Sequence, residues 1–564
     1  MTHPARRVAR ARLLVLLTFA LVLAALSLSR ARAQDASAPA YKIAYRIGMV
    51  ERESHLFDVE VKVSGLKGAG HVDFQMPRWS PGRYAVFDFA KNVQEARAVG
   101  PCADGERCGS KGYRVERLDT QTWRVAAPGD EISFSYRVFA DDLSGTFSQL
   151  DRRHANFNGG SVFVYVVGHK QDAVTLEVGA PAGWKVINGR STRPDQTEFG
   201  FPNYDELIDT PTEVAPDFTV QTFDVGGRAY RVVVHAFGGE GGNRGELVKA
   251  VERIVRAEVA TMGAPEFEQY TFLFHFDPTA RRGDGMEHLN STQIVETGPL
   301  SDRGALEGAI GTAAHEFFHV WNVKRLRPVG LGPWDFTRPV VTQGLWIAEG
   351  FTNYYGKLSL RRAGLWDDRQ LFDSYAGAVG GIENSQGSRL TSAVDSSVLA
   401  PFIDRATSDQ RTNTQNTLVS YYPKGETLAL PLDLIIRGRS KGRASLDEVM
   451  RRAYEEFYLK SPNDSYYLKG RGYTVDEFQR LASRVAGYDL SQFFDLHVYG
   501  TAPPPYDEAL AYVGLRMVRT QEPRAPGANE TAAPEPRTLY RIEKDDKAGP
   551  EAVKLREAWL RGNK

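Results

Sequence analysis

The sequence predicts an α+β protein with several domains: a β-sandwich, then a region of mixed helices and strands, then a mainly helical region. Apolar residues recur at every second position up to about Gly226, as in half-buried antiparallel strands. Beyond this point they recur at helical spacing, and an apolar content of 42% is ample for several large cores. We expect the three domains to span residues 34–226, 227–360 and 361–510.

The first 33 residues have the pattern of a secretory signal peptide. An arginine-rich start precedes an apolar run from Leu13 to about Leu28, and the segment ends in the small-x-small sequence Ala31-Arg32-Ala33. We therefore expect cleavage before Gln34 and a periplasmic or secreted protein that is not inserted in a membrane afterwards. An uncleaved anchor is the alternative, although the run is marginal in length for a span. Arg6-Arg7 leaves the choice between general and twin-arginine export open.

The charge balance excludes two classes of partner. The chain has 70 basic and 70 acidic residues, and loss of the six arginines in the signal segment makes the mature chain slightly acidic. Nucleic acid and anionic lipid both require a strongly basic surface, so we expect neither as a partner. The sequence does not indicate the oligomeric state.

Cys102 and Cys108 are the only cysteines of the chain. In an oxidising compartment this pair predicts one small disulfide that closes a loop. A metal site in the same stretch would need two more ligands, which "PCADGERC" does not offer.

The period-two pattern of the first domain is clearest in residues 55–63, "HLFDVEVKV", and in residues 132–138, "ISFSYRV". Between them, residues 76–89 ("MPRWSPGRYAVFDF") contain two prolines and a glycine. We expect this stretch to be an ordered turn packed by Trp79 and Tyr84.

The pattern changes after the strand "YRVVVHAF" (230–237). Residues 244–260 ("RGELVKAVERIVRAEVA") predict an amphipathic helix, and "YTFLFHF" from Tyr270 predicts a strand after it. From residue 519 the composition turns to Pro, Gly, Glu and Ala, so residues 511–564 are predicted to be a linker or disordered tail.

Two of the 11 histidines lie four residues apart on a predicted helix. Helical spacing runs across residues 301–323, and Ser301 or Asp302 can cap its start. One helical turn places His315 and His319 on the same face, where two imidazoles can hold one Zn²⁺. Glu316 lies beside that face and can accept a proton from water in the site. A buried helix with hydrogen-bonded histidines is the alternative, but the full H-E-x-x-H pattern favours a metal site.

Catalytic zinc needs a third protein ligand and one open position. Glu349 lies in "GLWIAEGFTNYYGKLSL", where its neighbours are apolar and aromatic. A charge in such surroundings is costly unless it is paired or bound to a metal. We therefore predict Glu349 as the third ligand and one zinc ion per chain, with a surface glutamate on an amphipathic helix as the alternative.

These residues carry a family resemblance. Residues 315–322 ("HEFFHVWN"), 345–355 ("LWIAEGFTNYY") and 421–437 ("YYPKGETLALPLDLIIR") resemble the glycyl aminopeptidase family of zinc metallopeptidases. Residues 76–93 and 472–510 resemble the N-terminal and C-terminal signatures of that family. The resemblance implies a thermolysin-like catalytic domain between a β-rich domain and a helical domain that closes the cleft.

The resemblance also implies roles for further residues. An edge-strand glutamate that binds the free amine of the substrate corresponds to Glu287 in "GDGMEHLNST", with Asp284 as the competing candidate and His288 expected to be structural. A tyrosine that stabilises the oxyanion corresponds to Tyr422 in "YPKG", with Tyr421 as the neighbouring alternative. Many family members end in a PDZ domain, whereas only about 50 residues follow residue 510 here, which is too short for a complete one.

Together these observations predict a zinc-dependent aminopeptidase that acts on peptides. A preference for small N-terminal residues such as Gly or Ala is implied by the resemblance alone. A zinc endopeptidase with the same site and a catalytically silent envelope protein that binds peptides are the two alternatives.

Overall fold

The computed structural model describes residues 40–100, 112–126, 129–193, 195–404, 414–461, 466–523 and 536–562. The expected signal segment and the cysteine pair Cys102 and Cys108 lie outside these ranges. Among the described residues, the structure contains no helix with the length and apolar character needed to cross a membrane.

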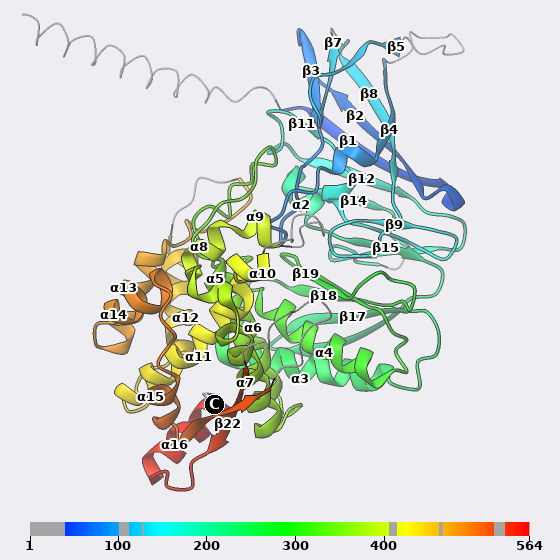
Figure 1. The fold of residues 1–564 in the computed structure, drawn as a ribbon. Helices are drawn as coiled ribbons and strands as arrows, with labels where there is room; N and C mark the ends of the chain where they lie inside the picture. Colours follow the sequence, from blue (N-terminus) through cyan, green and yellow to red (C-terminus); the bar gives the residue numbers. More distant parts are fainter. Residues whose placement is uncertain are drawn as a thin grey trace, which may run out of the picture.

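Two sheets form the β-sandwich of the first domain, shown in blue and cyan in Figure 1. Their strands are β1 (Lys42–Glu51), β2 (Leu56–Ser64), β3 (His71–Gln75), β4 (Val93–Val99), β5 (Gly112–Tyr113), β6 (Val115–Arg117), β7 (Thr122–Ala126), β8 (Glu131–Phe139), β11 (Tyr165–Val166), β12 (Val174–Gly179) and β14 (Glu198–Phe201). The sheet orders are β14-β12-β1-β2-β8-β4-β5 and β11-β3-β7-β6. The rings of Phe74 and Phe134 stack 4.3 Å apart where β3 meets β8. The predicted sandwich is confirmed.

A third, smaller sheet lies between the sandwich and the rest of the molecule (Figure 1). It consists of β9 (Gln149–Leu150), β10 (Ala155–Phe157), β13 (Lys185–Asn188) and β15 (Thr212–Ala215), in the order β13-β15-β10-β9. Four short helices accompany the three sheets: η1 (Arg52–Ser54), η2 (Phe89–Asn92), η3 (Gly159–Ser161) and α2 (Tyr204–Ile208).

The central sheet has five strands and a mixed topology. They are β16 (Thr219–Val225), β17 (Arg228–Ala236), β18 (Gln269–Phe276), β19 (Asp284–Glu287) and β20 (Ser291–Glu296), in the order β16-β17-β18-β20-β19. Strands β17, β18 and β20 are parallel, and β19 pairs antiparallel to β20 at one edge. Because β16 pairs with β17, this sheet begins at Thr219, before the border expected at residue 227.

Two long helices pack beside the central sheet. Helix α3 (Arg244–Met262) contacts α4 (Arg303–Phe318), and α4 lies against β19 and β20. The H-E-x-x-H motif is at the C-terminal end of α4, so its side chains are next to the edge strand.

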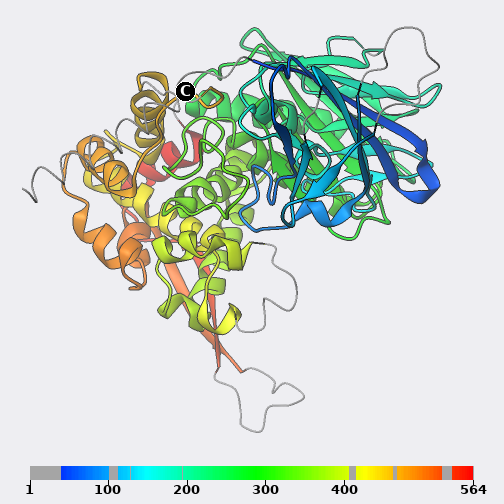
Figure 2. The same cartoon turned by 90° about the horizontal axis from the view of Figure 1, so that it is seen from above.

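The helices from α5 to α15 form the region shown in yellow-green to orange, which lies to one side of the blue and cyan strands of the sandwich when seen from above (Figure 2). They are α5 (Leu345–Ala348), α6 (Gly350–Arg362), α7 (Asp368–Glu383), η4 (Gln386–Arg389), α8 (Ala393–Val398), α9 (Ala400–Ile403), α10 (Thr414–Thr417), α11 (Tyr421–Arg439), α12 (Leu446–Tyr454), η6 (Glu455–Leu459), α13 (Val475–Ala486), α14 (Ser491–Phe493), η7 (Phe494–Tyr499) and α15 (Tyr506–Ala511). A mainly helical C-terminal region is thus confirmed.

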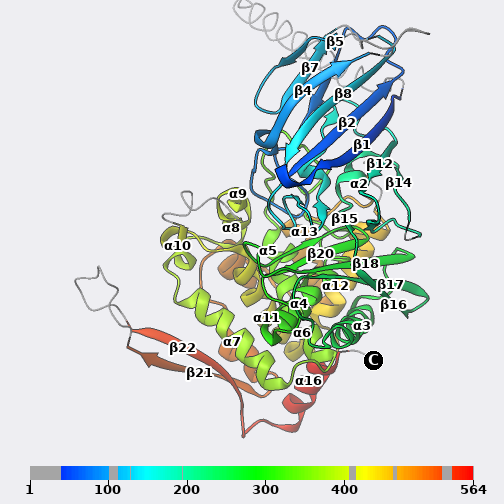
Figure 3. The same ribbon diagram turned by 90° about the vertical axis from the view of Figure 1, so that its right-hand side faces the viewer.

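The prediction of a disordered tail after residue 511 is wrong for the described part of that segment. Strands β21 (Leu515–Glu522) and β22 (Arg537–Lys544) form a hairpin that extends beside α7, and helix α16 (Pro550–Arg561) follows it (Figure 3). Asn384, the residue that follows α7, hydrogen-bonds with the backbone of Thr538. The buried Trp559 of α16 donates its Nε1–H to the Tyr354 hydroxyl at 2.8 Å. These contacts give the segment a fixed place that its composition did not indicate.

Candidate active site

The two histidines of the motif and Glu349 meet at one point. Helix α4 starts at Asp302, whose side chain accepts a hydrogen bond from Ala305 N at 2.8 Å. At its other end, the Nε2 atoms of His315 and His319 are 3.0 Å apart. Glu349 Oε2 is 3.3 Å from His319 Nε2 and 3.6 Å from His315 Nε2. The structure therefore brings together the three predicted zinc ligands.

The donor atoms of this cluster fit a zinc ion. His319 Nδ1 is 2.7 Å from the carbonyl oxygen of Asn322, so Nδ1–H donates to that oxygen. Nε2 of His319 consequently directs a lone pair at His315 Nε2 and at the carboxylate, an arrangement that repels unless a cation lies between them. Two imidazole nitrogens and one carboxylate oxygen are a common catalytic zinc set, with a fourth position left for water or substrate.

The charges around the cluster also favour a cation. Glu287, Glu316 and His319 have ligand atoms within 4.8 Å of one another, and all three side chains are buried. With Glu349, three carboxylates surround two imidazoles. Burial lowers the pKa of His319, but Glu349 and Glu287 outweigh it and raise this pKa to about 10, so these carboxylates favour either a proton or a metal ion on its Nε2. Burial raises the pKa of Glu316 to about 8. The buried site thus has an excess of negative groups that a divalent cation would balance.

Glycines allow the helices that carry the predicted zinc ligands to pack closely against each other and against α11. Glu349 lies at the junction of α5 and α6, and a Cβ on Gly350 would overlap the backbone of Gly425 on α11. A Cβ on Gly425 would in turn overlap the carbonyl of Trp346. On the other side of α6, a Cβ on Gly356 would be 3.2 Å from His315 Cα. These three glycines let α4, α6 and α11 pack backbone to backbone around the site.

Asn322 was not predicted as a site residue, although it ends the segment "HEFFHVWN". Its Nδ2 donates to the carbonyl oxygens of Ile347 and Ala348 at 2.9 and 3.2 Å. Its own carbonyl oxygen accepts from His319 Nδ1. Asn322 therefore fixes the orientation of one ligand and ties α4 to the turn that carries Glu349.

The first domain also reaches the site, which sequence reasoning missed. The Tyr84 hydroxyl donates to Glu349 Oε1 at 2.5 Å. The buried Arg83 donates to Asp284 Oδ1 at 2.5 Å and to Gly285 O at 2.9 Å. In the sequence, Arg83 and Tyr84 are adjacent polar residues within the turn of residues 76–89. We expected that turn to have only a packing role.

The contacts of Asp284 and Glu287 differ, and they favour Glu287 as the residue that binds the amine of the substrate. Asp284 is bound by Arg83 and by Gly145 N, so its carboxylate is already engaged. His288 is 3.1 Å from the buried Asp209, which Lys324 also contacts, in agreement with a structural role. Glu287 is at the end of edge strand β19 and is 4% exposed, and its carboxylate makes no hydrogen bond or ion pair with any described residue. Its carboxylate faces the cluster.

Comparison with known proteins agrees with this geometry. The Peptidase M61 N-terminal domain matches residues 44–216, and the M61 glycyl aminopeptidase domain matches residues 308–428. The chain belongs to the M61 glycyl aminopeptidase family. It is a metallopeptidase, and the match over residues 308–428 contains His315, His319, Glu349 and Tyr422. No curated protein matches the chain.

Two solved structures are similar to this chain. An aminopeptidase N family protein from Idiomarina loihiensis has 26% sequence identity and a TM-score of 0.75, and the alignment covers 87% of this chain and 82% of that one. An M1 zinc metallopeptidase from Deinococcus radiodurans has 14% identity and a TM-score of 0.47 over 82% of this chain and 94% of that one. The first of these confirms the predicted α+β class with a thermolysin-like catalytic domain.

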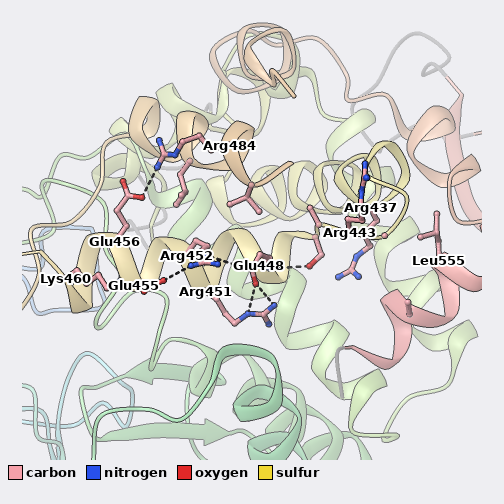
Figure 4. Close-up of a pocket in the computed structure, with 16 residues that line it drawn as sticks. Arg437, Arg443, Glu448, Arg451, Arg452, Glu455, Glu456, Lys460, Arg484 and Leu555 are labelled. Carbon is pink, nitrogen blue, oxygen red and sulfur yellow. Dashed lines mark hydrogen bonds and ion pairs between the residues drawn. The ribbon is translucent and has the colours of Figure 1, made fainter. Parts of the chain in front are cut away.

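Two pockets of this peptidase differ in their distance from the cluster of His315, His319 and Glu349. A small one of about 30 Å³ lies beside Glu287 and Tyr84 and is walled by Trp79, Trp334 and Leu468. A larger one of about 810 Å³ lies among α12, α13 and α16 (Figure 4). Its acidic side chains pair with arginines of its own lining, as Glu456 does with Arg484 at 2.8 Å, and it contains none of the predicted site residues.

The two tyrosines at the start of α11 differ in access to the site. Tyr421 is fully buried, and its hydroxyl has no partner among the described residues. Tyr422 is partly exposed, and its ring lies 6.3 Å from that of His315. Tyr422 is thus the better placed to contact a substrate.

We expect Tyr422→Phe to lower kcat by about 10²–10³ with little change in KM, because it removes a donor that acts mainly on the developing oxyanion. Steady-state kinetics on a peptide substrate measures this. Tyr421→Phe is the matched control and should keep near-normal kcat. The reverse pattern would assign the role to Tyr421.

Proposed function

We propose that this metallopeptidase is a zinc-dependent aminopeptidase that removes single residues, preferably small ones such as Gly or Ala, from the N-terminus of peptides. The observation that carries the proposal is Glu287: a buried carboxylate without a hydrogen-bond or ion-pair partner among the described residues, at the end of an edge strand and close to His319 and Glu316. An α-ammonium group of a substrate would supply the missing partner.

In the proposed mechanism, His315, His319 and Glu349 would hold one Zn²⁺, which would polarise the scissile carbonyl and lower the pKa of water in the site to about 7. Glu316 accepts the proton of the attacking water and then donates it to the leaving amine. Tyr422 donates a hydrogen bond to the oxygen of the tetrahedral intermediate. Gly285 leaves the space in front of Glu316 open, since a Cβ there would overlap the Glu316 carboxylate.

The size of the hollow beside Glu287 supports the preference for small residues. Its volume of about 30 Å³ leaves room for a hydrogen atom or a methyl group, while Trp79, Trp334 and Leu468 would collide with a large side chain. The export pattern of the first 33 residues supports a periplasmic or secreted location, where the substrates would be peptides of that compartment.

The test compares matched free and N-acetylated peptides. We expect the wild type to cleave only the free peptides. Glu287→Ala should lower kcat/KM for these by about 30-fold to several thousandfold, equivalent to the 2–5 kcal/mol lost when one partner of a buried charge pair is removed. Zinc content should be unchanged.

Glu268→Ala is the control for this test, because Glu268 is an exposed acid with no side-chain hydrogen bond or ion pair to any described residue. It should behave as the wild type. Efficient cleavage of acetylated peptides by the wild type would instead favour an endopeptidase. A fully active Glu287→Ala enzyme would place the amine site elsewhere.

A further inference from the structure

A second cluster of metal-binding side chains lies outside the active site. It consists of His154, Glu213, His235 and His275, each at most 1% exposed. One ligand atom from each lies within 4.8 Å of the others. The cluster shares no residue with the catalytic cluster, and none of its members has a part in the proposed peptidase mechanism.

The cluster joins two domains. Glu213 is on β15, and His154 immediately precedes β10, so both belong to the small third sheet. His235 and His275 are register partners on the parallel strands β17 and β18 of the central sheet. The four side chains therefore meet between the two sheets, and no local sequence spacing could have revealed them.

Glu213 is surrounded by imidazole nitrogens. Its Oε1 is 2.9 Å from His154 Nδ1 and 2.7 Å from His235 Nδ1, and its Oε2 is 2.9 Å from His275 Nε2. The His235 contact, although short, lacks hydrogen-bond alignment, because both ring nitrogens of His235 are without a hydrogen-bond partner among the described residues. His235 Nδ1 and Glu213 Oε1 are thus close together without forming a hydrogen bond.

The outer side of the His154 ring has the arrangement typical of a metal ligand, because His154 Nε2 is 2.9 Å from Gln149 Oε1. When this Nε2–H donates to Gln149, His154 Nδ1 directs a lone pair at the Glu213 carboxylate. His235 Nε2 is 3.2 Å from Asp217 Oδ1 but is not aligned for a hydrogen bond with it. A lone pair facing a carboxylate in a buried site needs a cation or a proton between them. His235 Nδ1 is 2.7 Å from Glu213 Oε1 and has no hydrogen-bond partner among the described residues, so a cation at this point would satisfy both atoms.

We propose that His154, Glu213, His235 and His275 form a second, structural zinc site that fastens the first domain to the central sheet. Three imidazole nitrogens and one carboxylate oxygen give a complete tetrahedral set, as in structural sites that leave no position open for substrate. Imidazole and carboxylate are both good ligands for zinc. The protein then binds two zinc ions per chain, one more than the sequence predicts.

The proposal does not depend on the peptidase mechanism, and metal counting separates the two sites. The full-length protein is loaded with Zn²⁺, dialysed and analysed by mass spectrometry of the metal. We expect two zinc ions per chain in the wild type, one in Glu349→Ala, one in His275→Ala and none in the double variant. His71→Ala is the control, because His71 is an exposed histidine of the first domain, and it should retain two.

A second measurement covers the case in which His275→Ala fails to fold. In the Glu349→Ala protein, where only the second site would remain, Zn²⁺ at about a hundredfold its Kd should raise the Tm by roughly 5–10 °C. Co²⁺ in the same protein should give the visible absorption of a four-coordinate site with nitrogen ligands. A folded Glu349→Ala protein that binds no metal and shows neither response would overturn the proposal.

Discussion

Glu316→Gln is expected to retain zinc and to lose a factor of about 10²–10⁴ or more in kcat. Glutamine has the shape of glutamate, so it fits the same space beside Gly285. Its amide cannot accept the proton of the attacking water, and it cannot return a proton to the leaving amine. The loss should therefore fall on kcat and leave metal binding unchanged.

The measurement is steady-state turnover of a free-amine peptide, together with zinc content and a far-UV spectrum of the same samples. Glu307→Gln is the matched control, because Glu307 is on the exposed face of the same helix, where it pairs with Arg303. It should keep full activity. Turnover near the wild-type rate in Glu316→Gln would rule out Glu316 as the general base.

Glu349→Ala is expected to remove the catalytic zinc ion and, with it, all measurable activity. Only one carboxylate oxygen faces both imidazoles, and alanine leaves two ligands where catalytic zinc requires three. The change also leaves the Tyr84 hydroxyl without its acceptor at 2.5 Å. The zinc content should fall by one ion per chain.

Asp373→Ala serves as the control for this variant. Asp373 is an exposed acid on the neighbouring helix α7, paired with Arg369, and its loss should change neither zinc content nor rate. If Glu349→Ala retained the full zinc content of the wild type, Glu349 would not be a ligand.

The zinc motif could be predicted from the sequence because its information is local. His315 and His319 share a helix face through their spacing alone, and Glu349 was conspicuous as a charge among apolar neighbours. The structure brings these three side chains together. Their roles as ligands stay a prediction until metal is measured.

The residues that were missed act across long sequence distances. Tyr84 contacts Glu349 over 265 positions, and Arg83 contacts Asp284 over 201. The four members of the second cluster come from four segments of two domains. No periodicity or spacing rule reports such contacts, because they depend on how separate sheets pack against each other.

The wrong prediction of a disordered tail after residue 511 has a different physical origin. The stretch between β21 and β22, which is rich in Pro and Ala, dominated the composition of the whole segment. The flanking strands and α16 are short, but each places apolar groups in contact with the protein, with Ile542 and Trp559 buried. A few such anchors are enough to hold a terminal segment in place.

The candidate active site combines residues that are far apart along the chain, and this affects when a newly made molecule becomes active. Tyr84 is translated early, the H-E-x-x-H helix about halfway along, and Tyr422 only about 100 residues after His319. At synthesis rates of about 5–20 residues per second, the histidines leave the ribosome roughly 5–20 s before this tyrosine. A nascent chain can thus fold its first domain and its metal-binding helix while it still lacks Tyr422, the proposed oxyanion donor, so we expect its peptidase activity to stay low until this residue has been added.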